Sequence, residues 1–392
     1  MIEELAKPEV IEFILQHETE DPAQLILSHS KTKDLPIALA AAQIQSRKKA
    51  KTKLPEWYAA QGVLFPHGIP IEQCSSEITA KYKATLIQGN SLVDLTGGTG
   101  IDTYYLSKQF QSTSYVEQNQ ELCGLAIHNF GRLNSKIDVV NSSAENFLAT
   151  LKATVDWIYI DPARRDQNSR KVFRIEDCTP NLIELQDILQ EKSKGVLIKY
   201  SPLLDISEIT RSVPDIDEIH IVSVNNECKE LLIVLKKSST DIKIRTINFQ
   251  RTEEQIFDFH PKKENECSIT LSLPQQYLYE PNSSIMKAGA FKIIAKKYNL
   301  NKLHPNSHLY TSEELVENFP GRVFQIIGMD ALKKKVIRKI IPNAKANIST
   351  RNFPLSVREI KKKLEIRDGG DIYIFATTLM NNKHILIICN KA

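Results

Sequence analysis

The chain has 392 residues, of which 42% are hydrophobic and 25% charged, an ordinary composition for a globular protein that excludes a disordered or repetitive chain. Its length predicts two to four domains. No apolar run approaches the roughly 18 residues that a membrane span needs, and Met1–Glu4 lacks the features of a secretion signal. The six scattered cysteines form no C-x-x-C pair. We therefore expect reduced thiols in a cytoplasmic protein, with no metal site and no membrane contact.

The net charge of +4 conceals an uneven distribution. Residues 281–392 hold 20 Lys and Arg against 8 Asp and Glu, a net charge of +12, whereas the preceding residues carry −8. A basic tail joined to an acidic body favours a polyanionic partner such as a nucleic acid. An ordinary solvated surface is the alternative interpretation.

Residues 1–88 are expected to form an N-terminal helical region. The segment Ala38–Ile44 contains no Gly or Pro and favours a helix, whereas prolines interrupt the stretch from residue 55 to residue 70. Ser75 or Ser76 is a candidate cap for a further helix at Ile78–Ile87.

From Ser91 onward, strand and helix patterns alternate, which predicts a parallel sheet covered on both faces. Seven strands are expected, at 91–95, 113–117, 137–141, 155–160, 195–200, 218–224 and 230–236, with helices near 102–109, 119–131, 143–150, 178–191 and 205–211. The gap at Asn225–Lys229 is too short for a parallel crossover, so the last two strands should form an antiparallel hairpin. This arrangement favours a Rossmann-like methyltransferase sheet over a dinucleotide dehydrogenase.

The polar stretch Lys237–Thr240 marks a junction to a region with a different pattern. Strands are expected at 241–249 and 267–273 and a helix at 284–298. From Phe319 the order is β-α-β-α-β-β, with strands at 322–327, 345–349, 371–377 and 384–389 and helices at 329–341 and 355–364. We therefore predict four parts, at 1–88, 89–238, 239–318 and 319–392.

The stretch Leu92–Asp102 has the layout of a buried strand, a tight turn and a helix start. Asp94 ends the strand, and Gly97, Gly98 and Gly100 form the turn. Glycines suit this position because a side chain would keep a ligand away from the backbone. The remaining question is which ligand the turn would accept.

Two cofactors suit a strand, a glycine loop and a helix. The dinucleotide loop G-x-G-x-x-G needs a third glycine where Thr103 stands. S-adenosylmethionine (SAM) needs an acidic residue before the turn and a carboxylate for its ribose hydroxyls, and Glu117 lies 23 residues after Asp94. The sequence therefore favours SAM over NAD, and a turn without any ligand is the remaining alternative.

A second polar group follows the fourth strand. Asp161 ends that strand, Pro162 fixes the backbone beyond it, and Arg164 and Arg165 follow. Because ligands of open α/β sheets bind at the carboxyl ends of the strands, these residues should face the same cleft as the glycine loop. We interpret them as catalytic: Asp161 would hydrogen-bond a substrate amine or orient the nucleophile, and the arginines would bind phosphate. Alternatively, Asp161 caps a turn and the arginines pair with nearby acidic residues.

These motifs resemble class I SAM-dependent methyltransferases, specifically the group that carries a THUMP-like C-terminal domain. The resemblance rests on Asp94–Asp102, Glu117 and Asp161–Arg165, and it extends to Gln73–Glu77, Tyr279–Lys287 and Ile348–Pro354. It implies a Rossmann-like methyltransferase domain followed by a ferredoxin-like segment and a THUMP-like module, a type associated with RNA binding.

The chain departs from the pattern of such enzymes at two places. After the third strand many members place an Asp that contacts adenine, whereas here Ser143 or the backbone at Ala144 would take its place. After the fourth strand, Ala163 and Arg164 replace the second proline and the aromatic residue of amino-group methyltransferases. Methylation of a base nitrogen is therefore only one option.

Two weaker signals remain open. Tyr200, at the end of the fifth strand, would either stack on a base or pack in the core. Cys178 would be either a nucleophile for pyrimidine C5 methylation, a role that no flanking motif supports, or a buried structural cysteine. The SAM site predicted from all these observations comprises Asp94, Thr96, Gly97, Gly98, Gly100, Asp102, Glu117, Ser143 and Ala144.

The leading hypothesis is a SAM-dependent methyltransferase that acts on RNA, such as rRNA or tRNA, held by the basic tail. An RNA-binding protein with a non-catalytic SAM fold is the second hypothesis. A methyltransferase for small molecules or proteins is the third, but it would leave the basic tail without a role.

Overall fold

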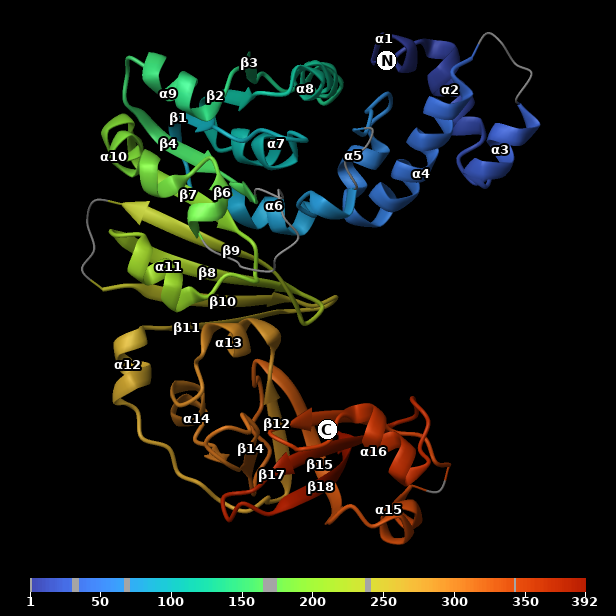
Figure 1. Ribbon diagram of the computed structural model, residues 1–392, viewed down its shortest axis with the longest axis vertical. Coiled ribbons are helices and arrows are strands. Elements are labelled where there is room, and N and C mark those ends of the chain that lie inside the picture. Colours follow the sequence, from blue (N-terminus) through green and yellow to red (C-terminus); the bar gives the residue numbers. More distant parts are fainter. Residues whose placement is uncertain (1, 30–34, 67–70, 165–174, 237–240, 342) are drawn as a thin grey trace. The chain divides into compact units, whose positions relative to one another are not determined.

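The computed structural model describes residues 2–29, 35–66, 71–164, 175–236, 241–341 and 343–392, which form a mixed α/β fold (Figure 1). The chain divides into two compact units. The first comprises Met1–Ile216 and Leu232–Ser239, and the second comprises Asp217–Leu231 and Thr240–Ala392. None of the described helices is long and apolar enough to cross a membrane.

The first unit begins with the expected helices. They are α1 (Ile2–Leu5), α2 (Pro8–Gln16), α3 (Pro22–Ser28), α4 (Ile37–Lys53), α5 (Pro55–Ala59) and α6 (Glu77–Ala84), with a 3-10 turn at Ile71–Gln73 before α6. The first four helices share a core that includes Val10, Leu25 and Ile44. Ser76 caps α6 by accepting a hydrogen bond from the backbone N–H of Thr79.

An extended segment after α5 is held by two side-chain amides. Gln43 of α4 bonds to both backbone groups of Phe65, donating to the carbonyl at 2.7 Å and accepting from the N–H at 2.9 Å. Asn129 does the same for Leu64, at 2.8 and 2.9 Å. Because each amide satisfies a buried donor and a buried acceptor, it replaces the neighbouring strand that this segment lacks.

A nine-stranded sheet contains all seven strands predicted for the methyltransferase part. Its strand order is β11-β10-β8-β9-β7-β4-β1-β2-β3. The seven strands are β1 (Gly89–Asp94), β2 (Phe110–Glu117), β3 (Asp138–Asn141), β4 (Val155–Ile160), β7 (Ser193–Tyr200), β8 (Ile216–Val224) and β9 (Glu227–Lys236). β1 pairs in parallel with β2 and β4, β2 with β3, and β4 with β7.

The helices between these strands also lie where the pattern placed them, with one correction. They are α7 (Ile101–Ser107), α8 (Gln120–Arg132), α9 (Ala144–Thr150), α10 (Leu182–Lys192) and α11 (Ile206–Ser212). The helix predicted to begin at residue 178 begins at Leu182, because Cys178–Thr179 forms a short strand, β6, and Pro180 follows. The partner of β6 is β5 (Ala163–Arg164).

The hairpin turn between β8 and β9 is formed by Asn225 and Asn226, whose φ angles are 51° and 63°. Asparagine tolerates this left-handed conformation better than most residues do. Two further strands, β10 (Lys243–Phe249) and β11 (Glu254–Phe259), extend the sheet beyond β8. β10 lies parallel to β8, and β11 is antiparallel to β10.

The second unit also contains a seven-stranded sheet of order β13-β14-β12-β15-β18-β17-β16. Its elements after β11 are α12 (Pro261–Glu266), β12 (Tyr277–Pro281), α13 (Ser283–Ala288), α14 (Ile293–Lys297), β13 (Asn301–Lys302), β14 (Tyr310–Ser312), β15 (Gly321–Asp330), α15 (Lys334–Ile340), β16 (Asn347–Arg351), α16 (Val357–Leu364), β17 (Ile372–Thr378) and β18 (His384–Lys391). The last six reproduce the predicted β-α-β-α-β-β order. α15 and α16 pack on a core that includes Ile337, Ile360 and Ile374.

Two predictions for this region were wrong. The strand expected at 267–273 is absent, and only an isolated bridge at Leu271 occurs there. The helix expected at 284–298 is divided into α13 and α14, because Gly289 ends α13 with a φ of 73°.

The polar run at the start of α13 has a structural role inside this unit. The backbone N–H of Ser283 donates to Asn226 Oδ1 at 2.7 Å, and its hydroxyl donates to Ser223 at 2.9 Å. Asn282 caps α13 and donates to Gln255 at 3.1 Å. These bonds attach α13 to the hairpin turn and to β11.

Candidate functional site

The glycine loop lies at the carboxyl end of β1 and is organised by Asp94, which is 1% exposed. Its Oδ1 accepts from the backbone N–H of Thr96 at 2.9 Å, and its Oδ2 accepts from the hydroxyl of Thr103 at 2.6 Å. Burial raises the pKa of this carboxyl to about 7, although both hydrogen bonds favour the ionised form. Thr103, which occupies the place of a third glycine, therefore has the specific task of holding Asp94.

The three glycines of the loop are required for different reasons. A Cβ on Gly97 would lie 2.2 Å from the Tyr115 ring, and one on Gly100 would lie 2.9 Å from Phe130. Gly98 has a φ of +53°, and a Cβ there would meet only the Thr96 carbonyl oxygen, at 3.6 Å. The backbone at Gly98 therefore faces open space, whereas the other two glycines make room for the protein's own rings.

Glu117 at the end of β2 supports the same loop. One carboxylate oxygen accepts from the Gly98 N–H at 3.0 Å, and the other accepts from the Asn119 N–H at 2.8 Å. Asn141 donates to the Glu117 carbonyl at 2.9 Å and so ties β3 to this corner. A carboxylate can accept about four hydrogen bonds, so Glu117 keeps acceptor capacity for a ligand.

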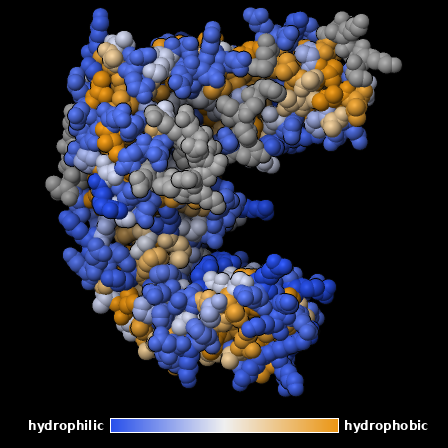
Figure 2. Space-filling view, viewed as in Figure 1, coloured by the Kyte–Doolittle hydropathy of each residue, from blue (hydrophilic) through white to orange (hydrophobic). Residues whose placement is uncertain are grey.

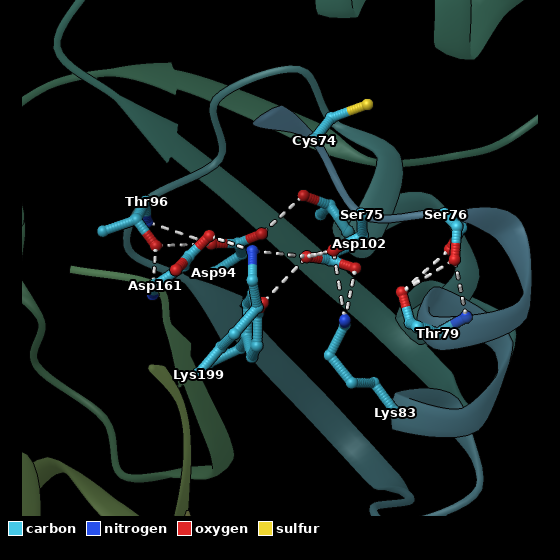
Figure 3. A network of polar contacts seen from close by, with 12 residues as sticks. Cys74, Ser75, Ser76, Thr79, Lys83, Asp94, Thr96, Asp102, Asp161 and Lys199 are labelled. Carbon is cyan, nitrogen blue, oxygen red and sulfur yellow. Dashed lines mark hydrogen bonds and ion pairs between the residues drawn. The ribbon is translucent and has the colours of Figure 1, made fainter. Parts of the chain in front are cut away.

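Asp102 forms the centre of a buried polar network, shown in Figure 3. Its Oδ2 accepts from the hydroxyls of Ser75 and Tyr159, both at 2.8 Å. Lys83 of α6, which is fully buried, lies 3.2 Å from Oδ1. Burial by itself would raise the pKa of Asp102, but the ammonium groups of Lys83 and Lys199 and the two hydroxyl donors outweigh it and hold the pKa below its usual value.

Asp161 lies beside this network at the end of β4. Its side chain forms an ion pair with Lys199, and the Lys199 ammonium lies 3.6 Å from Asp102 Oδ2 (Figure 3). The backbone N–H of Asp161 donates to the Thr96 hydroxyl at 2.7 Å. The carboxyl ends of β1, β4 and β7 therefore meet around Lys199, which is 15% exposed.

The other predicted site residues have simpler surroundings. Pro162 is buried, and Ser143 caps α9 by accepting from the Asn146 N–H at 3.2 Å, so Ala144 is the first residue of that helix. Arg164 lies on the short strand β5, and Arg165 falls outside the described residues.

The two weaker candidates are inaccessible. Tyr200 is 2% exposed and Cys178 is 3% exposed. Tyr200 therefore packs in the core, which was one of the two alternatives, and the Cys178 thiol is shielded from solvent. Neither residue presents a surface for a base.

Sequence reasoning did not select Lys83 and Lys199 for the site. Lys199 stands at the carboxyl end of the fifth strand of the alternating pattern, and that position was a usable signal. Nothing in the sequence around Lys83 predicts its burial, because lysine on an exposed helix face is the common case.

The fold and this loop define the class of protein: a Rossmann-like methyltransferase fold with a second α/β unit. Two family models match the C-terminal part of the chain. One describes a ferredoxin-like domain and matches residues 277–320, and the other describes a THUMP-like domain and matches residues 321–391. No functionally curated protein matches the sequence.

A solved structure matches nearly the whole chain. It is a candidate methyltransferase from Porphyromonas gingivalis W83, 34% identical, with 98% of both chains covered and a TM-score of 0.88. This chain therefore belongs to the family of class I SAM-dependent methyltransferases with a C-terminal THUMP-like domain.

Other solved structures match only part of the chain. A candidate class I SAM-dependent methyltransferase from Listeria monocytogenes is 13% identical over 62% of this chain and 94% of its own, with a TM-score of 0.39. An rRNA methylase from Streptococcus thermophilus is 12% identical over 41% and 95%, with a TM-score of 0.32. Scores this low add nothing to the family assignment.

Proposed function

We propose that this protein is a cytoplasmic methyltransferase that uses SAM to methylate RNA. In this proposal residues 89–238 bind SAM and act on the acceptor, and the THUMP-like part, 319–392, holds the RNA. The observation that carries it is the open space beside the Cα of Gly98, in a loop that Glu117 holds through the Gly98 N–H.

The residues of the loop fit SAM. The open space beside the Cα of Gly98 would take the aminoacid end, and the spare acceptor capacity of Glu117 suits two ribose hydroxyls. Asp94 and Asp102 would organise the loop, while Ser143 and Ala144 would lie by the adenine. When bound, SAM supplies an activated methyl group on a sulfonium.

The protein's own residues would then contribute mainly position. The hydrogen bond from Asp161 N–H to Thr96 joins the acceptor side of the site to the glycine loop. Asp161 would align the acceptor, and the buried ion pairs around Asp102 would keep this arrangement rigid.

RNA binding is supported by the basic surface of the second unit. Lys335, Lys339, Lys362 and Lys363 are exposed on α15 and α16, where Figure 2 shows mostly hydrophilic side chains. Within the described ranges, none of these four lysines forms an ion pair. Exposed lysines on neighbouring helices suit phosphate groups, whose binding releases counterions.

The test combines SAM binding with methyl transfer. Calorimetry on the full chain should detect SAM binding, and Gly98→Arg or Glu117→Ala should abolish or strongly weaken it. Transfer of tritium from methyl-labelled SAM to total RNA, taken from cells without the gene, should occur with the wild-type protein only. No SAM binding, or binding unaffected by both substitutions, would sink the proposal.

The same tritium-transfer assay distinguishes a methyltransferase from a protein that only binds RNA. A non-catalytic RNA-binding protein would retain RNA and transfer no tritium. If the RNA stays unlabelled and the tritium appears on a protein or a small molecule, the protein is a methyltransferase for that kind of substrate.

A further inference from the structure

We propose that the methyl acceptor is a ribose 2′-hydroxyl of RNA and that Lys199 and Asp161 act on it as an ammonium–carboxylate pair. This inference rests on the proposed function and names the atom that this function modifies. Its starting point is the place of the pair in the fold. The pair closes the acceptor side of the loop, next to Thr96, and it joins the ends of β4 and β7.

The pair is built into the site. Lys199 is 15% exposed and touches both Asp161 and Asp102, so its ammonium group is held from two sides. Asp161 is fixed through its backbone N–H by the Thr96 hydroxyl and keeps 36% of its side chain exposed. A partly exposed carboxylate beside a fixed ammonium can contact a substrate without a large rearrangement.

The charge of this pair favours an oxygen acceptor. A neutral amine that attacks a methyl group gains positive charge, which a neighbouring ammonium opposes. A hydroxyl must lose its proton, so a carboxylate that takes the proton and an ammonium that stabilises the developing negative charge on oxygen both help. Lys199 would be a disadvantage in a site for base nitrogens.

The described residues around the pair also offer no platform for a flipped base. Enzymes that modify bases hold the extruded base between aromatic or apolar side chains. Here Ala163 follows Asp161-Pro162, and the nearby Tyr200 is 2% exposed. Among the residues that the structure describes, the end of β4 therefore offers no ring to a base, whereas a ribose requires none.

The O–H bond of the ribose breaks and its proton passes to Asp161. The oxygen forms a bond to the methyl carbon as the C–S bond of the sulfonium breaks, and that electron pair stays on sulfur, which becomes a neutral thioether. Asp161 then releases one proton to water for each methyl group transferred.

The test uses the position of the label in RNA. Total RNA from cells without the gene is incubated with the full-length protein and tritiated SAM and is then hydrolysed in alkali. Alkaline cleavage needs a free 2′-hydroxyl, so 2′-O-methylation leaves labelled dinucleotides, whereas base methylation gives labelled mononucleotides. We expect the label in dinucleotides. Label in mononucleotides would overturn this inference and leave the proposed function intact, and RNA without any label would refute the proposed function itself.

Variants of the pair provide a second test. Lys199→Met and Asp161→Asn should each lower the transfer rate by about 10²-fold or more, and Lys199→Arg should recover at least a tenth of the wild-type rate. Lys194→Met is the matched control, because Lys194 pairs with Asp156 on the same two strands, at their other ends. It should retain transfer within about twofold.

SAM affinity at equilibrium shows whether Lys199 acts on the methyl acceptor or only supports the glycine loop. Because Lys83 still pairs with Asp102 in Lys199→Met, calorimetry should show a SAM affinity that falls far less than the transfer rate does, by at most about threefold. If SAM affinity falls as far as the transfer rate does, or if Lys199→Met transfers methyl groups normally, Lys199 does not act on the acceptor and the inference fails.

Discussion

Lys83 is the residue on which the buried network around Asp102 depends most. It is fully buried, and besides its ion pair with Asp102 it donates to the Ser75 hydroxyl at 3.1 Å. Removing one partner of a buried ion pair leaves an uncompensated charge. The network therefore has a role in stability that can be measured apart from function.

We predict that Lys83→Met lowers the free energy of unfolding by about 3 kcal/mol or more. The double variant Lys83→Met/Asp102→Asn should regain part of that loss, because it also removes the carboxylate charge that Lys83 no longer compensates. Urea unfolding of the wild type, both single variants and the double variant measures the coupling. Additive effects would contradict an ion pair of this strength.

Substitutions at single glycines of the loop can distinguish an effect on SAM binding from an effect on packing. Gly98→Ala should lower SAM affinity at least tenfold and cost only about 1–2 kcal/mol of stability, because φ is positive but the space is open. Gly97→Ala should destabilise more, because its Cβ would overlap the Tyr115 ring. Calorimetry and thermal unfolding measure the two effects.

Gly131 is the control for these substitutions. It lies inside α8 with nothing within 4 Å of its Cβ position. Gly131→Ala should leave SAM affinity unchanged and raise stability by up to about 1 kcal/mol through helix propensity. Equal losses of SAM affinity in all three variants would contradict a specific role for Gly98.

At the scale of elements, the extended segment Val63–Phe65 depends on helices α4 and α8. We predict that Asn129→Ala costs about 2–4 kcal/mol, since it leaves a buried donor and a buried acceptor of Leu64 without partners. Gln43→Ala should have a similar cost for the same reason at Phe65. Gln16→Ala, which removes an exposed amide, is the control and should change stability by less than about 0.5 kcal/mol.

The loop between β13 and β14 is held by Lys302, which is 2% exposed. Its ammonium donates to the Pro305 carbonyl at 2.7 Å and lies 3.1 Å from His308 Nδ1. Burial lowers the pKa of Lys302 to about 8, and Lys292 lowers it further while Glu264 opposes the shift. The folded state therefore binds this proton less tightly than the unfolded state does.

The pKa of Lys302 is lower in the folded state than in the unfolded state. Burial of its charged ammonium therefore destabilises the fold below pH 8, and this cost is relieved as the pH rises from 8 toward 10. We predict that the wild type gains about 2 kcal/mol relative to Lys302→Met between pH 7.5 and pH 9.5. Urea unfolding at both pH values measures this difference. The pKa of His308 is lowered to about 4 by burial and by Lys302, so His308 does not titrate in this window. A constant difference between the two proteins would contradict the prediction.

For the whole molecule, the basic helices of the second unit predict a strong dependence of RNA binding on salt. Lys362→Ala/Lys363→Ala should weaken RNA binding and lower the slope of log K against log[salt] by about 1.4, at ~0.7 for each phosphate that is no longer neutralised. SAM affinity should not change. Lys136→Ala/Lys152→Ala removes two exposed lysines of the first unit and is the control. If the two double variants weaken RNA binding equally, RNA binding depends on net charge and not on a defined surface of α16.

Much of the fold follows from local patterns. Alternating strands and helices, the short gap at Asn225–Lys229 and the glycine turn were enough to predict the seven strands, because each of these is a property of neighbouring residues. One of the two errors lies where a distant contact decides. Residues 267–273 have a strand-like composition but meet only the two-residue strand β13, through one bridge between Leu271 and Lys302. The other error was local, because the segment at 284–298 contains Gly289, whose left-handed conformation ends α13.

For the candidate site, the sequence by itself determined the acidic and glycine residues of the loop, Glu117 and Asp161, since their spacing follows from strand and turn lengths. Their roles in SAM binding and catalysis stay predictions. Only the tertiary structure decided that Gly98, of the three loop glycines, faces open space, that Tyr200 is buried, and that Lys83 and Lys199 converge on Asp102. The physical reason is that these features depend on side chains from α6, β4 and β7 meeting at one sheet edge, and no local pattern encodes such a meeting.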